Sequence, residues 1–394
     1  MKLSSKERML ASLNCEKVDY IPCSFMLFNA LRAKCKDDLE FFYEQINLGL
    51  DTVAYIPFTH RKIGQLTDFQ TPLGFPVRFD SKVKTKEWKS KENNVEILNK
   101  EYLTPEGKLE VKVKKTEDWI FGDRVPILND WLSSRSREFI LKDKEDLKKM
   151  KYLLTPPNKD DIETFRIEAN EAKKLAEKKS ILLAGMWGIG LDSVAWTIGL
   201  EKFMLITIDD PDFAMQYVDF IYNWNKKRME IILDFGVDLF VRRGWYEGVD
   251  FYTPNLFKKY IFPNLKKEAK LCHQAGSKYG YILTRGSLPL IDQLLEAEVD
   301  VLIGVDSSKM DPYMDIEKMK EKVNGRMSLW GGINQSIAIE SRTEKEINDS
   351  VKKTIKSFGE TNGFILSPVD NVLDLSKSVW EKVETFIKAW KTLR

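Results

Sequence analysis

Residues 300–334 read DVLIGVDSSKMDPYMDIEKMKEKVNGRMSLWGGIN, with a short apolar run at each end and a polar stretch between them. Each apolar run has about the length of a buried strand. Neither run alternates apolar with polar residues, which is typical of a strand covered on both faces. Parallel strands need a long crossover connection, usually a helix. The stretch therefore predicts a β-α-β unit of a parallel sheet.

The same pattern extends from this unit through most of the chain. Apolar runs of strand length, separated by helical stretches, lie at residues 20–26, 51–58, 180–187, 238–245, 277–284, 300–306, 327–334 and 363–370. Eight strands that alternate with helices fit an α/β fold of the closed (β/α)8 type, a TIM-type barrel. An open, doubly wound sheet is the alternative architecture.

The pattern changes between the second and third expected strands. Residues from about 68 to 115 contain short alternating stretches, such as VEILNKEYLT and KLEVKVKK, with a PEG turn at residues 105–107. Alternation of apolar and polar residues indicates half-buried antiparallel strands. The sequence thus predicts one barrel domain over residues 1–394, with an antiparallel β insertion at about 68–115 after the second strand.

The composition disfavours several classes of protein. The 62 Lys and Arg residues nearly balance the 60 Asp and Glu residues, and the net charge of +2 argues against binding to nucleic-acid phosphates. The N-terminal residues lack a signal-peptide core, and no apolar run is long enough to span a membrane. The four cysteines form no CxxC pair and are expected to be free thiols. We expect a cytoplasmic protein.

The candidate site follows from the expected fold, because barrels of this type place their active site at the carboxyl ends of the strands. The polar residues that follow the apolar runs are the candidates. They are Asn29, His60, Trp187, Asp192, Arg242, Arg243, Tyr246, Glu247, Thr284, Arg285, Asp306, Asn334, Ser367 and Asp370.

The segment RRGWYEG, residues 242–248, is the densest group of candidates, with two cations, two aromatic rings and a carboxylate directly after a strand. An arginine can bind a carboxylate or a phosphate, and Trp245 and Tyr246 offer faces for stacking. Glu247 can act as an acid or a base once it is partly desolvated. The alternative is that either arginine simply pairs with a neighbouring acid of the barrel.

Other candidates have equally ordinary alternatives. WGIGLDS, residues 187–193, resembles half of a dinucleotide fingerprint, but its third glycine is missing. A tight turn capped by Asp192 or Ser193 is favoured instead, with Trp187 as a pocket wall or a core residue. A loop histidine bonded to backbone is the alternative for His60. Two histidines in the whole chain exclude a histidine-rich metal site.

Carboxylates and aromatic rings are both expected at the mouth of the barrel. Asp306 and Asp370 each follow a strand, where they can accept a proton, hold a cationic group or cap the next helix. Aromatic faces stack planar rings and attract cations, so they favour a planar or a methylammonium substrate. The rings expected there are Phe25, Phe28, Trp187, Trp245, Tyr246 and Trp330.

Five stretches of the sequence carry a family resemblance. They are SSKERMLASLNCEKVDYIPCSF (4–25), TDFQTPLGFPVRF (67–79), YLTPEGKL (102–109), LWGGIN (329–334) and GFILSPVDNV (363–372). Together they resemble the uroporphyrinogen decarboxylase superfamily over nearly the whole chain. The resemblance implies a single (β/α)8 barrel. Members include the decarboxylase and methyltransferases that serve corrinoid proteins, and REFILKDKEDLKKMKYL (137–153) is similar to the methyltransferase branch.

Two activities of the superfamily are disfavoured by residues that differ. The arginine-rich MRQAGR signature of the decarboxylase is not matched by CSFMLFNALRAKCK (23–36), and its glycine-histidine-glycine signature is missing. Thiol-directed methyltransferases of the superfamily bind zinc through an HxC pair and a later cysteine. Leu283 and Arg285 stand where the pair would fall, and Asp370 stands where the later cysteine would be. No zinc is therefore expected.

The resemblance implies a methyltransferase that moves a methyl group between a small molecule and the cobalt of a partner corrinoid (cobalamin) protein. A methoxylated aromatic, as for an O-demethylase, or a methylated amine is the expected methyl donor. Transfer from methylcorrinoid to tetrahydrofolate, a related decarboxylase and a non-catalytic binding barrel are the alternatives. No nucleic-acid or membrane partner is expected, and a homodimer is one expected assembly.

The residues expected to perform this reaction come from the strand ends. Tyr246, Glu247 and Asp370 are the expected catalytic residues, with Tyr246 ranked first as the donor of a proton or hydrogen bond to the leaving heteroatom. The residues expected to bind the substrate are Asn29, His60, Trp187, Arg243, Trp245, Arg285, Asp306 and Asn334.

Overall fold

The structure is a computed structural model that describes residues 2–57, 78–307, 311–334, 339, 341–359, 362–372 and 374–394. It divides into two compact units. The first unit comprises Met1–Ile56, Ala169–Met186 and Leu233–Arg394, and the second comprises Pro57–Glu168 and Trp187–Ile232. The extent of a single domain over residues 1–394 stays a prediction.

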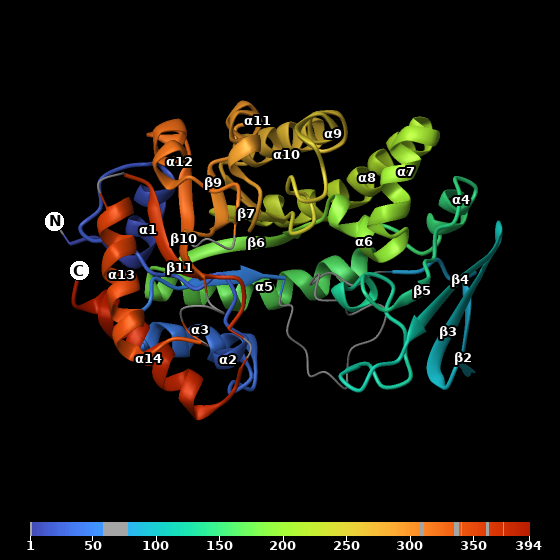
Figure 1. The fold of residues 1–394 in the computed structure, drawn as a ribbon, viewed down its shortest axis with the longest axis horizontal. Helices are drawn as coiled ribbons and strands as arrows, with labels where there is room; N and C mark the ends of the chain where they lie inside the picture. The colour runs from blue at the N-terminus through green and yellow to red at the C-terminus, as the bar shows by residue number, and fades with distance from the viewer. Residues whose placement is uncertain are drawn as a thin grey trace. The chain divides into compact units, whose positions relative to one another are not determined.

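A seven-stranded parallel sheet in the order β1-β6-β7-β8-β9-β10-β11 forms the centre of the first unit (Figure 1). Its strands are β1 (Val53–Ile56), β6 (Leu182–Gly188), β7 (Leu239–Arg243), β8 (Lys278–Ile282), β9 (Val301–Val305), β10 (Ser328–Asn334) and β11 (Phe364–Val369). Each of the seven lies within a predicted apolar run, or extends one residue beyond it. Sequential strands are neighbours in this sheet, as a (β/α)8 barrel requires.

The eighth predicted strand, residues 20–26, is an extended segment at the seam between β11 and β1. Cys23 forms a parallel bridge with Leu366 of β11, and its carbonyl accepts a hydrogen bond of 2.8 Å from the backbone N–H of Asp51. Pro22 has no N–H to give to a ladder, which limits the segment to isolated bridges. The fold is thus the predicted TIM-type barrel, with its first strand reduced to this seam.

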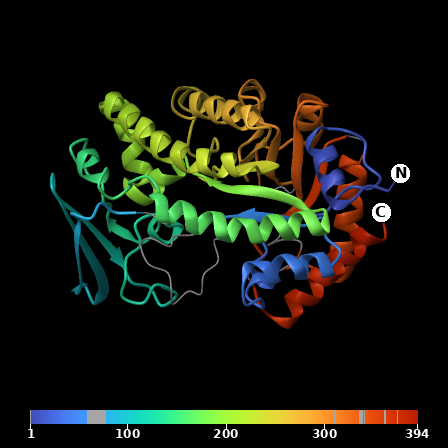
Figure 2. The same ribbon diagram turned by 180° about the vertical axis from the view of Figure 1, so that it is seen from behind.

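Helices cover the sheet of the first unit. They are α1 (Ser5–Leu13), α2 (Asn29–Arg32), α3 (Asp38–Asn47), α9 (Pro254–Tyr260), α10 (Phe262–Gln274), α11 (Ile291–Glu296), α12 (Ile316–Val323), α13 (Glu344–Phe358) and α14 (Lys377–Lys391), with a short 3-10 helix η4 (Leu288–Leu290). In Figures 1 and 2, α13 and α14 run side by side next to β11. Phe358 of α13 stacks on Phe364 of β11 with ring centroids 4.4 Å apart, so apolar faces bind helix to sheet.

The second unit contains a four-stranded antiparallel sheet in the order β2-β3-β4-β5. Its strands are β2 (Lys84–Glu92), β3 (Val95–Thr104), β4 (Gly107–Lys114) and β5 (Ser136–Glu138). The predicted antiparallel insertion is therefore present. Three strands lie within the expected bounds, whereas β5 follows them in the chain. Residues 68–77 of the expected insertion lie outside the described residues.

The remaining helices are α4 (Asp146–Met150), α6 (Val194–Thr197), α7 (Leu200–Asp209), η2 (Asp130–Leu132) and η3 (Leu191–Ser193) in the second unit. Two longer helices, α5 (Lys159–Lys179) and α8 (Pro211–Phe235), contribute residues to both units. Within the described part of the chain, no helix has both the length and the apolar character needed to cross a membrane.

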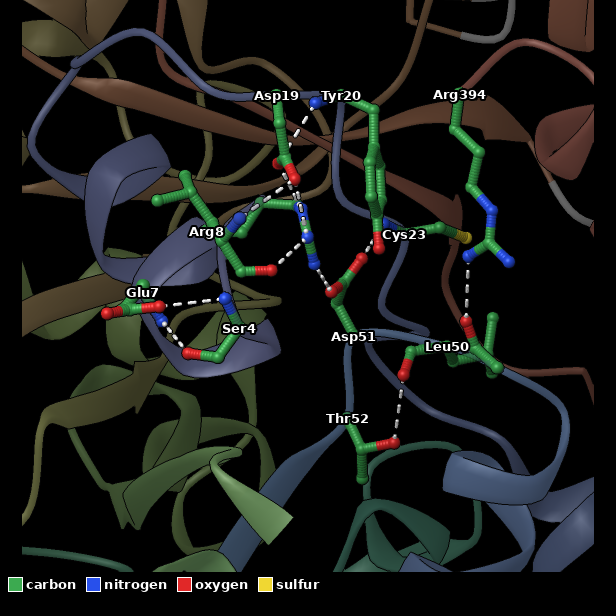
Figure 3. Close-up of polar contacts among 12 residues, drawn as sticks. Ser4, Glu7, Arg8, Asp19, Tyr20, Cys23, Leu50, Asp51, Thr52 and Arg394 are labelled. Atoms are coloured by element: carbon green, nitrogen blue, oxygen red, sulfur yellow. Dashed lines mark hydrogen bonds and ion pairs between the residues drawn. The ribbon is translucent and has the colours of Figure 1, made fainter. Parts of the chain in front are cut away.

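A buried arginine holds the seam of the barrel together (Figure 3). Arg8 on α1 donates from Nη1 to Asp51 at 2.7 Å, and from Nε and Nη2 to Asp19 at 2.7 and 2.9 Å. The other carboxylate oxygen of Asp51 accepts from the N–H of Cys23 at 3.2 Å, and the guanidinium lies 3.6 Å from the centroid of the Tyr20 ring. Arg8 thus joins α1 to both sides of the seam.

The two acids titrate differently because their surroundings differ. The hydrogen bonds from Arg8 lower the pKa of Asp19 to about 2, whereas burial raises the pKa of Asp51. Asp51 is 2% exposed, so its charge depends on the neighbouring guanidinium. Removing one partner of such a buried pair leaves an uncompensated charge, which typically costs about 3–5 kcal/mol of unfolding free energy.

We therefore expect Arg8→Met to lower the free energy of unfolding by about 3–5 kcal/mol near neutral pH. Without its cation, buried Asp51 has a higher pKa in the folded state than in the unfolded state. The folded variant then takes up a proton as the pH falls, and the loss of stability shrinks between about pH 7 and about pH 4.5. Denaturant titrations at both pH values measure this change.

The matched control is Lys6→Met on the same helix, because Lys6 forms a partly exposed ion pair with Asp238 at 2.8 Å. An exposed pair contributes at most about 1 kcal/mol. Equal losses in the two variants, or a loss for Arg8→Met that does not change with pH, would show that the seam does not depend on the buried pair.

Candidate functional site

The loops that follow β7 and β8 pack directly on one another at the carboxyl end of the sheet. A Cβ atom added to Gly248 would lie 2.3 Å from the carbonyl oxygen of Arg285, so only glycine permits this approach. The contact brings the residues that follow β7 next to those that follow β8. Predicted site residues from these two strand ends therefore do lie close together in the first unit.

The two arginines that end β7 point to opposite faces of the sheet. Arg242 pairs in register with Tyr281 of β8, and its Nε atom lies 3.6 Å from Glu268 of α10. The side chain of Arg242 therefore lies between the sheet and its covering helices. Side chains alternate along a strand, so Arg243 points to the other face, which is the interior of the barrel.

Glu247 is an ion-pair partner of Arg242 on the helix-covered side. Its two carboxylate oxygens lie 2.7 and 3.0 Å from Nη2 of Arg242, and the hydroxyl of Tyr281 donates to Oε2 at 2.5 Å. Glu247 is fully buried. Arg242 and Glu247 thus fit the alternative given for residues 242–248, in which an arginine simply pairs with a neighbouring acid. Arg243 and the two aromatic residues have different surroundings.

Trp245 and Tyr246 form the tip of the turn after β7. Both are half-buried, and the N–H of Glu247 closes the turn on the carbonyl of Gly244 at 3.0 Å. The guanidinium of Arg243 lies 4.7 Å from the centroid of the Trp245 ring, and Tyr246 meets Phe251 edge to face at 5.9 Å. The turn therefore presents an indole, a phenol and a cation at the strand end.

Charged groups lie beside this turn in the loops after β8 and β9. Nε of Arg285 lies 3.3 Å from Asp250, and Arg285 is exposed. Asp311 accepts hydrogen bonds from the backbone N–H groups of Gly286 and Tyr313, at 2.9 and 3.0 Å. Burial raises the pKa of Asp311 even so. Asp311 and Asp250 escaped the sequence analysis because neither directly follows an apolar run.

The ends of β9 and β10 are joined by two of the predicted residues. Nδ2 of Asn334 donates to Oδ2 of Asp306 at 2.7 Å. Asp306 is buried and Asn334 is half-buried. Sequence reasoning placed both residues at the mouth, and the structure brings them together. The amide orients the buried carboxylate, so the pair can offer one fixed acceptor to a substrate.

Asp370 and Asn29 lie at the seam end of the site. Asp370 is exposed and has a φ angle of 68°, a left-handed conformation that few residues other than glycine adopt. The next residue, Asn371, accepts from the backbone N–H of Asn29 at 3.0 Å, which ties α2 to the loop after β11. Strained backbone of this kind often marks a functional position.

Several predicted residues have other positions. Trp187 is half-buried near the end of β6 and Asp192 is buried in η3, both within the second unit. His60 lies outside the described residues. Ser367 is buried and accepts from the backbone N–H of Met26 at 2.9 Å, and Thr284 is half-buried beside β8.

Three of the six aromatic rings expected at the mouth belong to the core instead. Trp330 is fully buried, and its indole N–H donates to the carbonyl of Ser24 at 2.8 Å. Phe25 and Phe28 are buried, with their ring centroids 4.3 Å apart. An apolar run and its flanks do not tell a core ring from a pocket ring, which is why the sequence placed these three wrongly.

Two tyrosines of β8 were not among the residues predicted from the sequence. The hydroxyl of Tyr279 donates to Glu268 of α10 at 2.6 Å, and that of Tyr281 donates to Glu247. Burial raises the pKa of Tyr279 well above its usual value, so the hydroxyl keeps its proton. A signal was present, because two tyrosines spaced by two residues share one strand face and need polar partners when buried.

A depression of about 590 Å³ lies at the other end of these strands. His273, Glu298, Asp300 and Arg326 are among its lining residues, and Asp300 immediately precedes β9. His273 bonds Asp300 at 2.7 Å. Active sites of such barrels lie at the carboxyl ends of the strands, so this depression is not the candidate site. No described group of three or more His, Cys, Asp or Glu side chains is arranged to hold a metal ion.

Comparisons with known proteins place this fold in a family. No curated protein sequence matches the chain. A methyltransferase from Methanosarcina mazei has a similar solved structure, with a TM-score of 0.62, 14% sequence identity, and 99% of each chain covered. D-psicose 3-epimerase from Clostridium cellulolyticum H10 gives a TM-score of 0.35 at 12% identity, over 58% of this chain and 84% of that one.

The family model for uroporphyrinogen decarboxylase (URO-D) matches residues 137–393, which is more than half of the chain. That range contains β6 to β11 and the loops after β7 to β11, from which most of the candidate site is built. The chain therefore belongs to the uroporphyrinogen decarboxylase (URO-D) family.

Proposed function

We propose that this protein is a methyltransferase that moves a methyl group between a small molecule and the cobalt of a corrinoid (cobalamin) carried by a partner protein. Family membership and the likeness to the Methanosarcina mazei methyltransferase over 99% of both chains support the proposal. The observation that carries it is the half-buried turn after β7. This turn places a phenol donor and an indole beside an inward-facing guanidinium.

The donor set at the strand ends does not suit zinc. Leu283, which is buried, and Arg285, which pairs with Asp250, stand where thiol-directed relatives have their HxC pair, and Asp370 stands in place of the later cysteine. Zinc sites are built from Cys, His and carboxylate ligands, and neither Leu nor Arg can serve. We therefore assign no step to a metal held by this chain.

The corrinoid, when its own protein presents it, supplies a reduced cobalt that accepts the methyl group. The exposed Asp370 and the half-buried Tyr246 leave the strand ends open to a group held by another protein, which fits a cofactor carried by a partner. The bond between the methyl carbon and its heteroatom breaks, and the heteroatom keeps the electron pair. Tyr246 donates its hydroxyl proton or a hydrogen bond to that heteroatom, which makes the leaving group more stable.

A methoxylated aromatic or a methylated amine is the proposed donor. The indole of Trp245 provides a stacking face for a ring or an attractive face for a methylammonium group. Arg243, Arg285 and the Asp306–Asn334 pair would orient the polar groups of the donor, with Asn29 at the seam end of the site. Glu247 and Asp370 are the other proposed proton donors. Because Arg242 and Tyr281 already bind Glu247, Tyr246 ranks ahead of it.

The first test of the function is the absorbance of a reduced corrinoid protein mixed with this protein and candidate donors. Methyl transfer changes the corrinoid spectrum, whereas binding alone does not. Demethylation of a methoxylated aromatic or a methylated amine is the expected result. Transfer only from methylcorrinoid to tetrahydrofolate, or release of carbon dioxide from a carboxylated substrate without a spectral change, would overturn the proposal.

The role of Tyr246 is testable through the leaving group. We expect Tyr246→Phe to slow demethylation of an aryl methyl ether by about 10²–10⁴-fold, because a phenoxide needs a proton or hydrogen bond as it leaves. A quaternary ammonium donor leaves as a neutral amine and should be slowed much less. Tyr43→Phe, on the exposed face of α3, is the control. Equal losses on both donors would rule out proton donation by Tyr246.

Two variants of Asp370 distinguish an effect on methyl transfer from an effect on stability. Asp370→Gly relieves its left-handed backbone but frees the unfolded chain, so the free energy of unfolding should stay within about 1 kcal/mol of the parent. Asp370→Ala keeps the strain and should be about 1 kcal/mol less stable than the glycine variant. Both lose the carboxylate and should lose methyl transfer alike. Full activity in Asp370→Gly would show that the carboxylate takes no part.

The expectation that these strand ends bind no zinc can be tested by direct measurement. Elemental analysis of the purified protein should find no stoichiometric zinc, and chelation should leave methyl transfer unchanged. One zinc per chain, together with activity lost on chelation and restored by zinc, would mean that other residues replace the missing ligands.

A further inference from the structure

Three buried side chains, Arg242, Glu247 and Tyr281, form what we call the β7 clamp. Nη2 of Arg242 donates to both carboxylate oxygens of Glu247, and the hydroxyl of Tyr281 donates to one of them at 2.5 Å. None of the three is more than 1% exposed. Charge-assisted hydrogen bonds are strong, and exclusion of water strengthens them further. The carboxylate of Glu247 is therefore held in one place.

A second buried carboxylate lies beside the clamp, on the side covered by helices. Glu268 of α10 lies 3.6 Å from Nε of Arg242 and accepts a hydrogen bond from Tyr279. Burial opposes the charge on Arg242, but Glu247 and Glu268 together hold the pKa of Arg242 well above its usual value. The guanidinium thus stays charged wherever the protein is folded.

The clamp fixes both ends of the turn that carries Trp245 and Tyr246. At one end, the held residue Glu247 closes the turn through its own N–H. At the other end, the Tyr281 ring packs on Gly244 so closely that a Cβ atom there would lie 2.5 Å from the ring. The two residues between these points therefore have little freedom to change direction. Their placement depends on side chains that lie behind the strand.

We propose that the β7 clamp is a positioning device that aims Tyr246 and Trp245 at the substrate. The inference rests on the proposed function and adds to it Arg242 and Tyr281, which are not among the residues proposed to touch the substrate. Arg242 points away from the interior of the barrel, so it acts only through Glu247 and the turn. A catalytic hydroxyl that is misplaced by about 1 Å can lose about 10²-fold in rate, which makes such a device valuable.

The two tyrosines of β8 provide a matched pair of variants. Both are fully buried on the same face of one strand, and each donates its hydroxyl to a glutamate. Tyr281 binds Glu247 of the turn, whereas Tyr279 binds Glu268 of α10 and lies outside the clamp. Tyr281→Phe and Tyr279→Phe remove the same atom from similar surroundings. Only Tyr281→Phe is expected to loosen the turn.

Amide hydrogen exchange measures the turn without any need for activity. In Tyr281→Phe we expect the amide of Glu247 to exchange about tenfold faster, as the loss of one buried hydrogen bond predicts. In Tyr279→Phe it should exchange at the parent rate. In methyl-transfer assays, Tyr281→Phe should lower kcat for an aryl ether more than for a quaternary ammonium donor, with KM little changed. Tyr279→Phe should leave both constants unchanged.

A second variant keeps the test decisive if Tyr281→Phe folds poorly. The triple change Arg242→Met, Glu247→Met and Glu268→Gln removes the buried cation and the charge of both its carboxylate partners, and replacing a buried ion triad in this way is often neutral for stability. It should fold, speed exchange across residues 244–248 and lower kcat for the ether donor. Parent-like exchange in a folded triple variant would overturn the proposal.

The outcomes of this experiment and of the test of function can be told apart. If no donor is demethylated by the parent protein, the proposed function fails, while the exchange rates still report whether the clamp holds the turn. If methyl transfer occurs and the two tyrosine variants lose kcat equally on both donors, the clamp is a structural element only. The positioning role is then wrong.

Discussion

The buried pair of Arg8 and Asp51 is the interaction on which the barrel depends. A parallel barrel closes only when its last strand meets its first, and here the first strand is a segment interrupted by Pro22. That segment cannot form a full ladder with either neighbour. Side chains replace the missing ladder, because Asp51 binds the backbone of Cys23 with its carboxylate while Arg8 neutralises the charge. Closure thus combines isolated backbone bridges with a buried ion pair.

The residues that stabilise the seam and the residues of the candidate site lie at opposite ends of the strands. Asp51 precedes β1, so the seam pair lies toward the amino ends of the strands, whereas the half-buried turn with Tyr246 lies at the carboxyl ends. Residues at the amino end can be fully buried and paired without cost to function. Residues that are proposed to meet a substrate at the carboxyl end need some exposure, and Trp245, Tyr246 and Asp370 have it. This division is general for the fold.

The architecture was predictable because strand length, apolar runs and helical spacers are local signals that the chain repeats. Seven runs became strands, and the eighth differed for a local reason, its proline. The site was predictable only in part. Asp306 and Asn334 follow strands and do meet, but a strand end gives no information on which face a side chain takes. Trp330, Phe25 and Phe28 were therefore assigned to the mouth although they are buried in the core.

The adjacent residues Arg242 and Arg243 show why the faces matter for function. The sequence offers two arginines with the same chemistry, and one strand turns them to opposite sides. Arg242 meets two buried glutamates and can only be structural in its direct contacts, whereas Arg243 stacks on the indole at the tip of the turn. A buried cation requires buried anions, so Glu247 and Glu268 follow from the position of Arg242. Because Arg242 and Tyr281 bind the carboxylate of Glu247, the proposed function ranks the half-buried phenol of Tyr246 ahead of it as a proton donor.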